Sequence, residues 1–307
     1  MLKYVVRRLL ILAPTLFAII AISFFMIRVA PGGPFDANRK ATPEVMANLK
    51  RAYHLDEPLP EQFARYLWGV AQLDFGPSFK YRDYSVSELI FRGFPISLEL
   101  GLWAIALAAL AGIALGTVAA LRQNSLADYL VMAGAMVGIV VPTFVTAPIF
   151  QLIFALMLGW LPVSGWENGD WHNKVLPIVT LALPEIAVIS RLTRGSMIEA
   201  MRSNHVRTAR AKGLGLFRTV TRHALLGGLL PTIAYLGPAT AGIVTGSIVI
   251  ERVFAIPGIG RYFVEAASNR DYTLVMGTVI FYGILILIAN LVVDVTYSVL
   301  DPKVRYD

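Results

Sequence analysis

The chain of 307 residues is 56% hydrophobic and only 15% charged, and its mean hydropathy is +0.64. Because soluble domains carry about 25% charged residues, this composition excludes an ordinary soluble domain and predicts an all-α membrane protein. The net charge of +7 comes largely from loops beside apolar segments, so we expect no nucleic-acid partner, and the absence of cysteine excludes disulfides and thiolate metal sites.

Six segments are long and apolar enough to cross a membrane core of about 30 Å, which needs roughly 20 residues. They lie at 9–29, 96–121, 130–158, 175–189, 225–250 and 274–300. The fourth is the shortest, and its ends are the least defined. The first follows Lys3, Arg7 and Arg8 as in a signal peptide, but it lacks a small-residue cleavage site. We therefore expect an uncleaved first span.

Basic residues divide unequally between the two sides of these spans. The side that holds both termini and the loops near 122 and 191–223 carries 14 Lys and Arg, against four in the short loops of the other side. The basic residues of the stretch at 28–92 are left out of this comparison, because the positive-inside rule does not apply to loops of that length. The rule predicts that both termini are cytoplasmic.

The first 29 residues are taken as an N-terminal tail and first span, and 30–95 as a small external subdomain ahead of a five-span core at 96–307. The subdomain contains eight acids and helix-like stretches at 43–53 and 60–71. Its DFGPSFKYRDYS run predicts turns and extended chain. The run also carries four aromatic residues, Phe75, Phe79, Tyr81 and Tyr84. We expect these to pack at the membrane surface rather than to contact a substrate.

Small residues recur four apart inside the spans. The pairs are Gly112 and Gly116, Gly134 and Gly138, and Gly242 and Gly246. This spacing lets helix backbones approach closely, so we expect these positions to pack helices within one subunit. Prolines at 142, 148, 231 and 238 predict kinks.

The loop at 191–226 is the most distinctive polar stretch. Between 191 and 223 it carries eight Lys and Arg against one acid, Glu199. Ser196 is placed to cap a helix that runs to about 211, Gly213 and Gly215 are expected to end it, and a second short helix is expected at 218–226. We therefore predict a cytoplasmic helix-turn-helix. On charge alone, a solvated basic linker is the alternative.

Few ionisable residues lie inside the spans. Glu99 lies near a span end, where solvation accounts for it. Glu185 and Asp294 are candidates for a functional role because a charge within the membrane is costly.

The link at 251–272 is too polar to span and too apolar for a free loop. It contains a PGIG turn and predicts a re-entrant or interfacial segment near the outer mouth. Its Glu251, Pro257 and Gly258 are, with Glu185 and Asp294, candidates for the translocation path or gate.

Catalytic and cofactor motifs are missing from the sequence. It contains no GxxxxGK[ST] phosphate loop, no HExxH and no GxSxG. We therefore expect no enzyme activity, no ATPase site, no metal site and no bound cofactor in this chain.

The loop resembles a known family at specific positions. VRTARAKGLG at 206–215, RHAL at 222–225 and Pro231 resemble the cytoplasmic coupling loop of ABC-importer permeases. Gly213 matches the family glycine and Ala209 the second alanine, while Arg207 and Thr208 replace the usual Glu and first Ala, as in the peptide-transport branch. Further stretches along the whole chain, such as DFGPSFKYRDYSV and DPKVRYD, are most similar to the B-type oligopeptide permeases.

The resemblance implies a transporter subunit with several partners. These are a homologous second permease, two cytoplasmic ABC ATPases that use ATP and Mg, an extracytoplasmic peptide-binding protein, a peptide substrate and the lipid bilayer. It also implies location in the bacterial inner membrane as a multi-pass protein. It assigns the ATPase-coupling role to the loop, at Arg207, Thr208, Ala209, Arg210, Ala211, Lys212, Gly213 and His223. At Ala209 and Gly213, added bulk is expected to block docking.

Two alternatives remain open from the sequence. A dipeptide or nickel ABC permease has the same architecture and differs in its binding protein. A stand-alone secondary carrier would use Glu185 or Asp294 for ion coupling, and it would transport without partner subunits.

Overall fold

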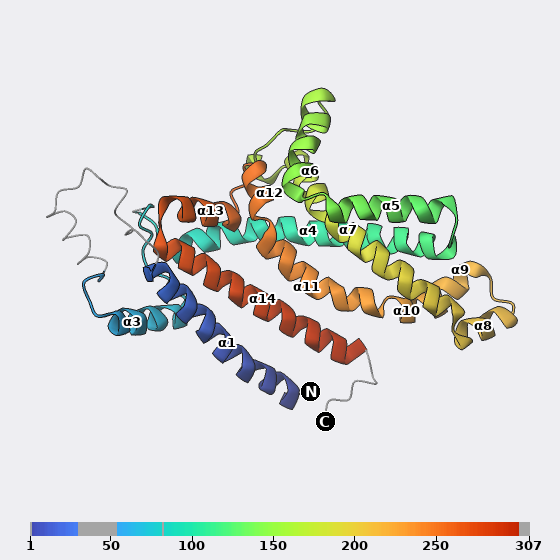
Figure 1. Cartoon of the computed structure of the whole chain (residues 1–307), viewed down its shortest axis with the longest axis horizontal. Helices are drawn as coiled ribbons and strands as arrows, with labels where there is room; N and C mark the ends of the chain where they lie inside the picture. Colours follow the sequence, from blue (N-terminus) through green and yellow to red (C-terminus); the bar gives the residue numbers. More distant parts are fainter. Residues whose placement is uncertain (1, 30–53, 82, 301–307) are drawn as a thin grey trace. The chain divides into compact units, whose positions relative to one another are not determined.

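The computed structural model describes residues 2–29, 54–81 and 83–300, with side chains except at 2–9, 168, 246 and 293–300. This part of the chain is almost entirely helical (Figure 1). Its one β feature is an isolated bridge between Pro77 and Ser85, inside the run predicted to be extended. The helix expected at 43–53 lies outside the described residues.

Five of the six predicted spans coincide with helices that are long and apolar enough to cross a membrane. They are α1 (Leu2–Val29), α4 (Val86–Leu121), α7 (Trp171–Arg202), α11 (Leu230–Gly246) with α12 (Ile248–Val253), and α14 (Tyr272–Leu300). The predicted fourth span was too short, because α7 has 32 residues. Its last turns carry Arg191 and Arg194, so an apolar run does not reveal where this helix ends.

The third predicted span is broken rather than continuous. Helix α5 (Leu126–Val140) and the segment formed by α6 (Thr143–Phe150) and the π-helix η1 (Gln151–Met157) meet at an angle of 106°. The break lies at Val141 and Pro142, both extended. A proline disfavours the α conformation in the residue before it and has no N–H to donate, so the helix stops there. The proline kink was predicted, but the sharp bend was not.

The chain divides into two compact units. Unit 1 comprises Met1–Ser97, Pro257–Leu291 and Arg305–Asp307, and unit 2 comprises Leu98–Ile256 and Val292–Val304. Each unit therefore combines segments that lie far apart in the sequence. The division of the chain into a tail, an external subdomain and a core stays a prediction.

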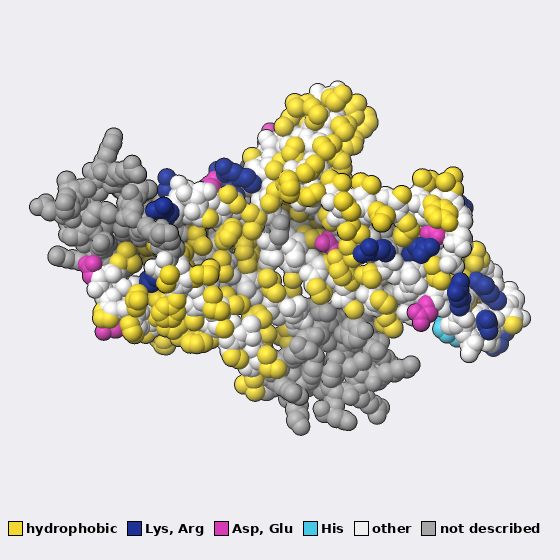
Figure 2. All heavy atoms as spheres, in the orientation of Figure 1, with side chains coloured by type: hydrophobic (Ala, Val, Ile, Leu, Met, Phe, Trp, Pro, Cys, Tyr) yellow, Lys and Arg dark blue, Asp and Glu magenta, His cyan; other side chains and the backbone are white. Residues whose placement is uncertain are grey.

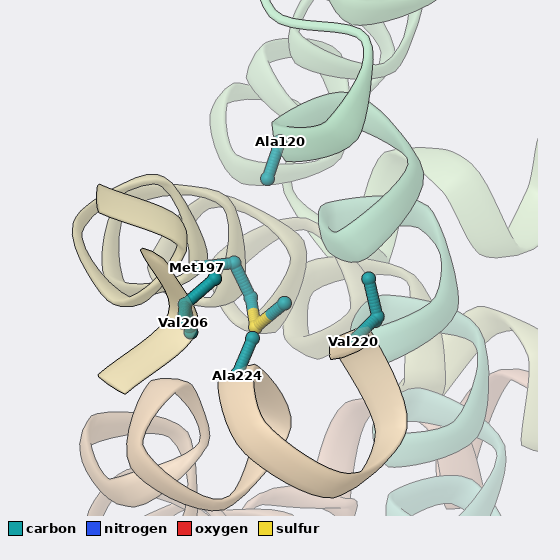
Figure 3. Close-up of a cluster of buried hydrophobic side chains, with 5 residues drawn as sticks. All are labelled: Ala120, Met197, Val206, Val220 and Ala224. Carbon is teal, nitrogen blue, oxygen red and sulfur yellow. The ribbon is translucent and has the colours of Figure 1, made fainter. Parts of the chain in front are cut away.

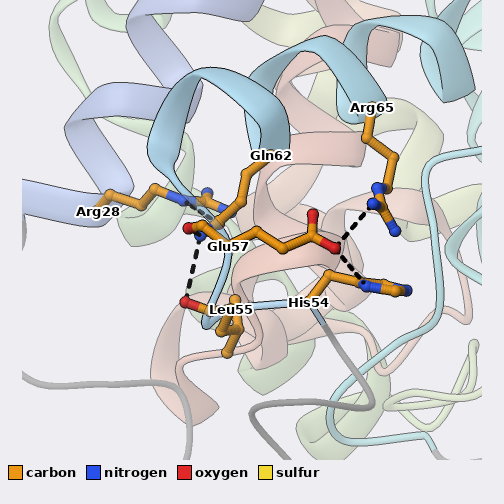
Figure 4. A network of polar contacts seen from close by, with 6 residues as sticks. All are labelled: Arg28, His54, Leu55, Glu57, Gln62 and Arg65. Carbon is orange, nitrogen blue, oxygen red and sulfur yellow. Dashed lines mark hydrogen bonds and ion pairs between the residues drawn. The ribbon is translucent and has the colours of Figure 1, made fainter.

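In unit 1, α3 (Leu59–Ala71) packs on α1 through aromatic rings. The Phe24 and Phe63 ring centroids lie 5.2 Å apart, and Phe24 is fully buried. Arg28 donates two hydrogen bonds to Gln62 Oε1, at 2.7 and 3.1 Å, and Gln62 Nε2 donates to the carbonyls of Leu55 and Glu57 (Figure 4). Gln62 therefore connects the end of α1 to the turn that precedes α3.

The same turn carries an exposed charge cluster. Glu57 Oε1 lies 2.9 Å from His54 Nδ1 and 2.8 Å from Arg65 Nη2 (Figure 4). Helix α3 itself agrees with the stretch predicted at 60–71.

The 74–85 run of unit 1 is anchored to α13 (Ile259–Asn269) and α14. Ser78 Oγ donates to Asp271 Oδ2 at 2.5 Å, and Tyr81 donates to Glu265. Burial and this hydrogen bond raise the pKa of Tyr81 to about 12. Phe75 is buried, and an added Cβ at Gly277 would lie 3.1 Å from its Cβ.

The prediction that these aromatic residues pack at the membrane surface is therefore wrong for Phe75, which is buried within unit 1. For Tyr81, which is half-buried, it stays a prediction. Hydrophobicity alone does not distinguish a ring buried within the protein from a ring at the lipid interface, because both environments favour aromatic residues.

Helix α7 is the central helix of unit 2, and it contacts α5, α6, α10 and α11. Close approach to α7 depends on glycine. An added Cβ would lie 2.6 Å from Ile189 Cγ2 at Gly112, 2.5 Å from the Ser190 carbonyl oxygen at Gly116, and 3.0 Å from Ala187 Cβ at Gly138. The expected role in packing is confirmed at these three positions. Gly134 and Gly242 have nothing within 4 Å of such a Cβ.

These glycines give a matched pair of substitutions. We expect Gly116→Ala to destabilise the protein by about 1–3 kcal/mol, because the contacted carbonyl oxygen belongs to backbone that cannot turn away. Gly134→Ala should be neutral or slightly stabilising, since its methyl group meets open space and alanine favours helix. Thermal unfolding of both variants in detergent tests this difference. Equal midpoints would contradict the close approach of α4 and α7.

Candidate functional site

The predicted loop of 191–226 folds as a pair of short helical segments after α7. Helix α7 continues through Ser196 to Arg202, and α8 (Asn204–Ala211) follows after Ser203. The predicted cap at Ser196 is therefore wrong. Ser196 Oγ instead donates to the Leu192 carbonyl at 2.9 Å and lies 2.5 Å from the Gly228 carbonyl oxygen, because a serine inside a helix can bond the carbonyl four residues back.

Gly213 ends α8, as the sequence predicts. Its φ of +79° lies in the left-handed region, and its N–H donates to the Arg210 carbonyl at 2.9 Å. The Leu214 N–H donates to the Ala209 carbonyl at 3.2 Å, which closes the last turn of the helix. A left-handed residue after a helix favours glycine because a Cβ is strained there.

The return segment consists of three short helical pieces. They are α9 (Leu216–Thr219), the π-helix η3 (Val220–Ala224) and α10 (Leu225–Gly228). Thr219 is buried, and its hydroxyl donates to the Gly215 carbonyl at 3.1 Å. The second predicted helix is thus present, with a π-helical middle.

A small hydrophobic core holds the loop together. Figure 3 shows Met197 of α7 pointing between Val206 of α8 and Ala224 of η3. Val220 and Ala120 complete the buried cluster. Gly228 allows the return segment to lie close to α7, because an added Cβ would be 2.5 Å from Met197 Sδ. The loop is therefore packed on the end of α7 rather than free.

The predicted coupling residues divide into exposed and buried sets. The exposed set comprises Arg207, Thr208, Arg210, Ala211, Lys212 and Gly213. Figure 2 shows Lys and Arg side chains gathered over α8 and α9. Ala209 is only 4% exposed and packs inward, so bulk at this position would disrupt the loop's own interior. The His223 side chain is half-buried, and its carbonyl oxygen lies 3.1 Å from His205 Nε2.

A buried ion pair next to this loop was missed by the sequence reasoning. Asp128 of α5 accepts hydrogen bonds from Arg194 Nε at 2.5 Å and Nη2 at 2.7 Å, and from the Asn124 N–H at 2.9 Å. Asp128 is 2% exposed and the Arg194 side chain 26%. The spacing of Ser125 and Asp128 matches a helix-capping box. This pattern could have shown from the sequence that Asp128 lies in the first turn of a helix. The pair fixes α5 to α7.

The candidate path residues belong to several elements. Glu185 follows Pro184 on α7 and accepts a hydrogen bond of 2.7 Å from the Tyr235 hydroxyl of α11. Glu251 is fully buried in the first turn of α12 and is bonded to Ser247. Their role in a path stays a prediction.

The remaining candidates belong to the outer link and to α14. Gly258 occupies the N-cap position of α13, is buried, and lies against Gly93 of α4, where an added Cβ would be 3.0 Å from the Gly258 carbonyl carbon. Pro257 directly precedes it. Asp294 is part of α14, but its side chain lies outside the described residues. In the described ranges, no group of three or more His, Asp or Glu residues is placed to hold a metal ion.

Known proteins match the chain over its full length. Residues 112–306 match the family described as "Binding-protein-dependent transport system inner membrane component", and residues 1–101 match its N-terminal counterpart. The chain is 53% identical over 306 residues to the oligopeptide transport system permease protein OppB of Escherichia coli, covering 100% of both chains. It is 42% identical to the dipeptide transport system permease protein DppB of Bacillus subtilis, covering 99% of this chain and 98% of that one.

A solved structure supports the same fold. An inward-facing form of the MetNI methionine ABC transporter gives a TM-score of 0.57 at 16% identity, covering 69% of this chain and 96% of the matched one. At this identity the likeness concerns the fold alone. Together with the match over residues 112–306 and the full-length identity to permeases, it shows that the chain belongs to the family of binding-protein-dependent transport system inner membrane components, the permease subunits of ABC importers.

Proposed function

We propose that the chain is a transmembrane permease subunit of an ATP-driven importer of oligopeptides. The observation that carries the proposal is the identity of 53% to an oligopeptide permease over the full length, against 42% to a dipeptide permease. The subunit forms half of a translocation path, and a homologous second permease forms the other half. It resides in the bacterial inner membrane with both termini in the cytoplasm, as the distribution of basic residues favours.

The exposed face of α8 and the Gly213 turn form the proposed docking surface for a cytoplasmic ABC ATPase. Two features support this role. The surface presents Arg207, Arg210 and Lys212, which suit acidic partner residues, and it rests on the core around Met197. Because that core joins α8 to the end of α7, a push on the surface by two ATPases closing on ATP and Mg moves the span as well. Alternating access requires such differential contact in two states.

The remaining partners follow from the same assignment. An extracytoplasmic binding protein delivers the peptide, and selectivity for side chains resides largely in that protein. The nickel and dipeptide alternatives differ in the delivered substrate. The alternative function to be tested is a secondary carrier that transports without partner subunits. In such a carrier, Glu185 of α7 or Asp294 of α14 would couple transport to an ion gradient.

Reconstitution distinguishes these functions. Proteoliposomes that contain this chain, the second permease, both ATPases and the binding protein should accumulate a labelled tetrapeptide only when ATP is enclosed on the ATPase side. An excess of unlabelled dipeptide or Ni²⁺ should leave that uptake unchanged. Proteoliposomes with this chain alone should show no uptake along a proton or sodium gradient. Uptake by the chain alone, or competition by Ni²⁺, would contradict the proposal.

A further inference from the structure

A hydrophobic groove of about 520 Å³ lies in unit 2, between α4 and the return segment of the loop. One side follows a single face of α4 from Leu110 to Leu121. At 1.5 Å per residue this face is about 16 Å long. The other side is formed by residues of α9, η3 and α10, among them Leu216, Phe217 and Val220. The groove therefore joins the last three turns of a membrane span to the loop.

The groove is apolar but ends where the chain becomes polar. Its hydroxyl groups come from Thr117 and Thr221. Thr221 donates to the Phe217 carbonyl at 2.8 Å, whereas the buried Thr117 hydroxyl has no hydrogen-bond partner among the described residues. Directly after Leu121, the chain continues with the exposed Arg122. This arrangement is typical of the boundary between the hydrocarbon core and the headgroup region.

The loop side of the groove has the character of an interfacial helix. Phe217 is 80% exposed and Leu216 is also exposed, although both lie between Lys212 and Arg218 in the sequence. Arg218 and Arg222 directly follow two groove-lining residues, and both are exposed. A segment that combines exposed Leu and Phe with Arg lies in the plane of a membrane surface and favours anionic lipid.

We propose that the groove binds an acyl chain of an anionic phospholipid whose phosphate headgroup contacts Arg218 and Arg222. The apolar lining suits the acyl chain, and the two exposed arginines that follow lining residues suit a phosphate. An apolar helix of a partner would leave these arginines without a counter-charge. A lipid bound there contacts both α4 and the proposed coupling loop. Anionic lipid therefore strengthens the attachment of the loop to the span, a role that does not depend on which peptide is transported.

The absence of cysteine from this chain makes a site-specific test direct, because a single introduced thiol is the sole labelling position when the subunit is labelled before assembly. A fluorophore is attached at Val118→Cys in the groove, or at Leu115→Cys, which is exposed on α4 but does not line the groove. The assembled transporter is placed in bilayers that contain acyl-brominated phosphatidylglycerol or phosphatidylcholine. At position 118, phosphatidylglycerol should be preferred about tenfold over phosphatidylcholine, as measured by quenching. At position 115, the preference for phosphatidylglycerol should be no greater than the general enrichment of anionic lipid around a basic protein surface.

Charge variants test the headgroup contact. Arg218→Gln with Arg222→Gln should abolish the preference at position 118 while leaving quenching by both lipids. Arg210→Gln, which removes an exposed charge of the same loop outside the groove, should leave the preference intact. Equal preference at both labelled positions, or an equal loss with Arg210→Gln, would overturn the proposal in favour of nonspecific surface charge. Absence of quenching at position 118 by either lipid would overturn it in favour of a protein partner in the groove.

Discussion

A Gly213→Val variant is expected to insert into the membrane at normal levels, and its rate of peptide uptake is expected to fall at least tenfold. Gly213 has φ +79°, and an added Cβ would meet nothing within 4 Å, so the strain arises from the backbone rather than from crowding. A β-branched residue in this conformation costs on the order of 1–3 kcal/mol. The turn is expected to relax and to shift the last turn of α8, which carries Arg210. Uptake of labelled tetrapeptide, with immunoblotting of membrane levels, measures the effect.

A Gly213→Asn variant is the matched control. Asparagine adopts the left-handed conformation far more readily than valine, so we expect uptake within about twofold of wild type. Loss of uptake in both variants at normal protein levels would show that the ATPase contact tolerates no side chain at this position. Full uptake by Gly213→Val would contradict a coupling role for the turn.

Asp128→Ala is expected to destabilise the folded protein by about 1–3 kcal/mol. The change leaves Arg194, which is 26% exposed, without its bidentate carboxylate and leaves the Asn124 N–H without its acceptor. The loss is moderate rather than larger, because the guanidinium that remains can still reach solvent. Thermal unfolding in detergent, followed by tryptophan fluorescence, gives the change in midpoint.

A double-mutant cycle separates this pair from general damage. Asp128→Ala with Arg194→Ala should be less destabilised than the sum of the two single variants, because neither charge is then left alone. Arg202→Ala should change stability by less than about 0.5 kcal/mol, since Arg202 is exposed and makes one hydrogen bond of 3.3 Å to Gln123. Additive effects of the pair would contradict a direct ion pair.

Much of the fold was predictable because membrane helices follow simple rules of length and hydropathy. All six predicted spans correspond to helical segments, and the helix end at Gly213 and the interruption at Pro142 were recognised from the backbone preferences of glycine and proline. The angle at Pro142 was not predictable, because a proline shows that a helix is interrupted but does not set the direction in which the chain continues.

The local structure of the candidate coupling loop was predictable only in part, and its coupling role stays a proposal. The sequence motif RTARAKGL predicted a helix with basic residues, which corresponds to α8. The motif did not indicate that the Ala209 side chain faces inward. A small residue such as Ala209 suits both close contact with a partner protein and close packing inside the loop. Which of the two occurs depends on the face of α8 that is turned toward Met197. Asp128 and Arg194 lie 66 residues apart, so local patterns could not pair them.

The contact between the two ends of the loop also determines how permeases can be recombined. Ser196 bonds to the Gly228 carbonyl oxygen, and a Cβ added at position 228 would lie 2.5 Å from Met197 Sδ, so Met197 would have to shift. An exchange of α8 and its turn alone would place a foreign helix on a core evolved for another sequence. A hybrid transporter intended to work with a different ATPase should therefore inherit residues 196–228 as one block, joined within the continuous helix α7 and just before α11.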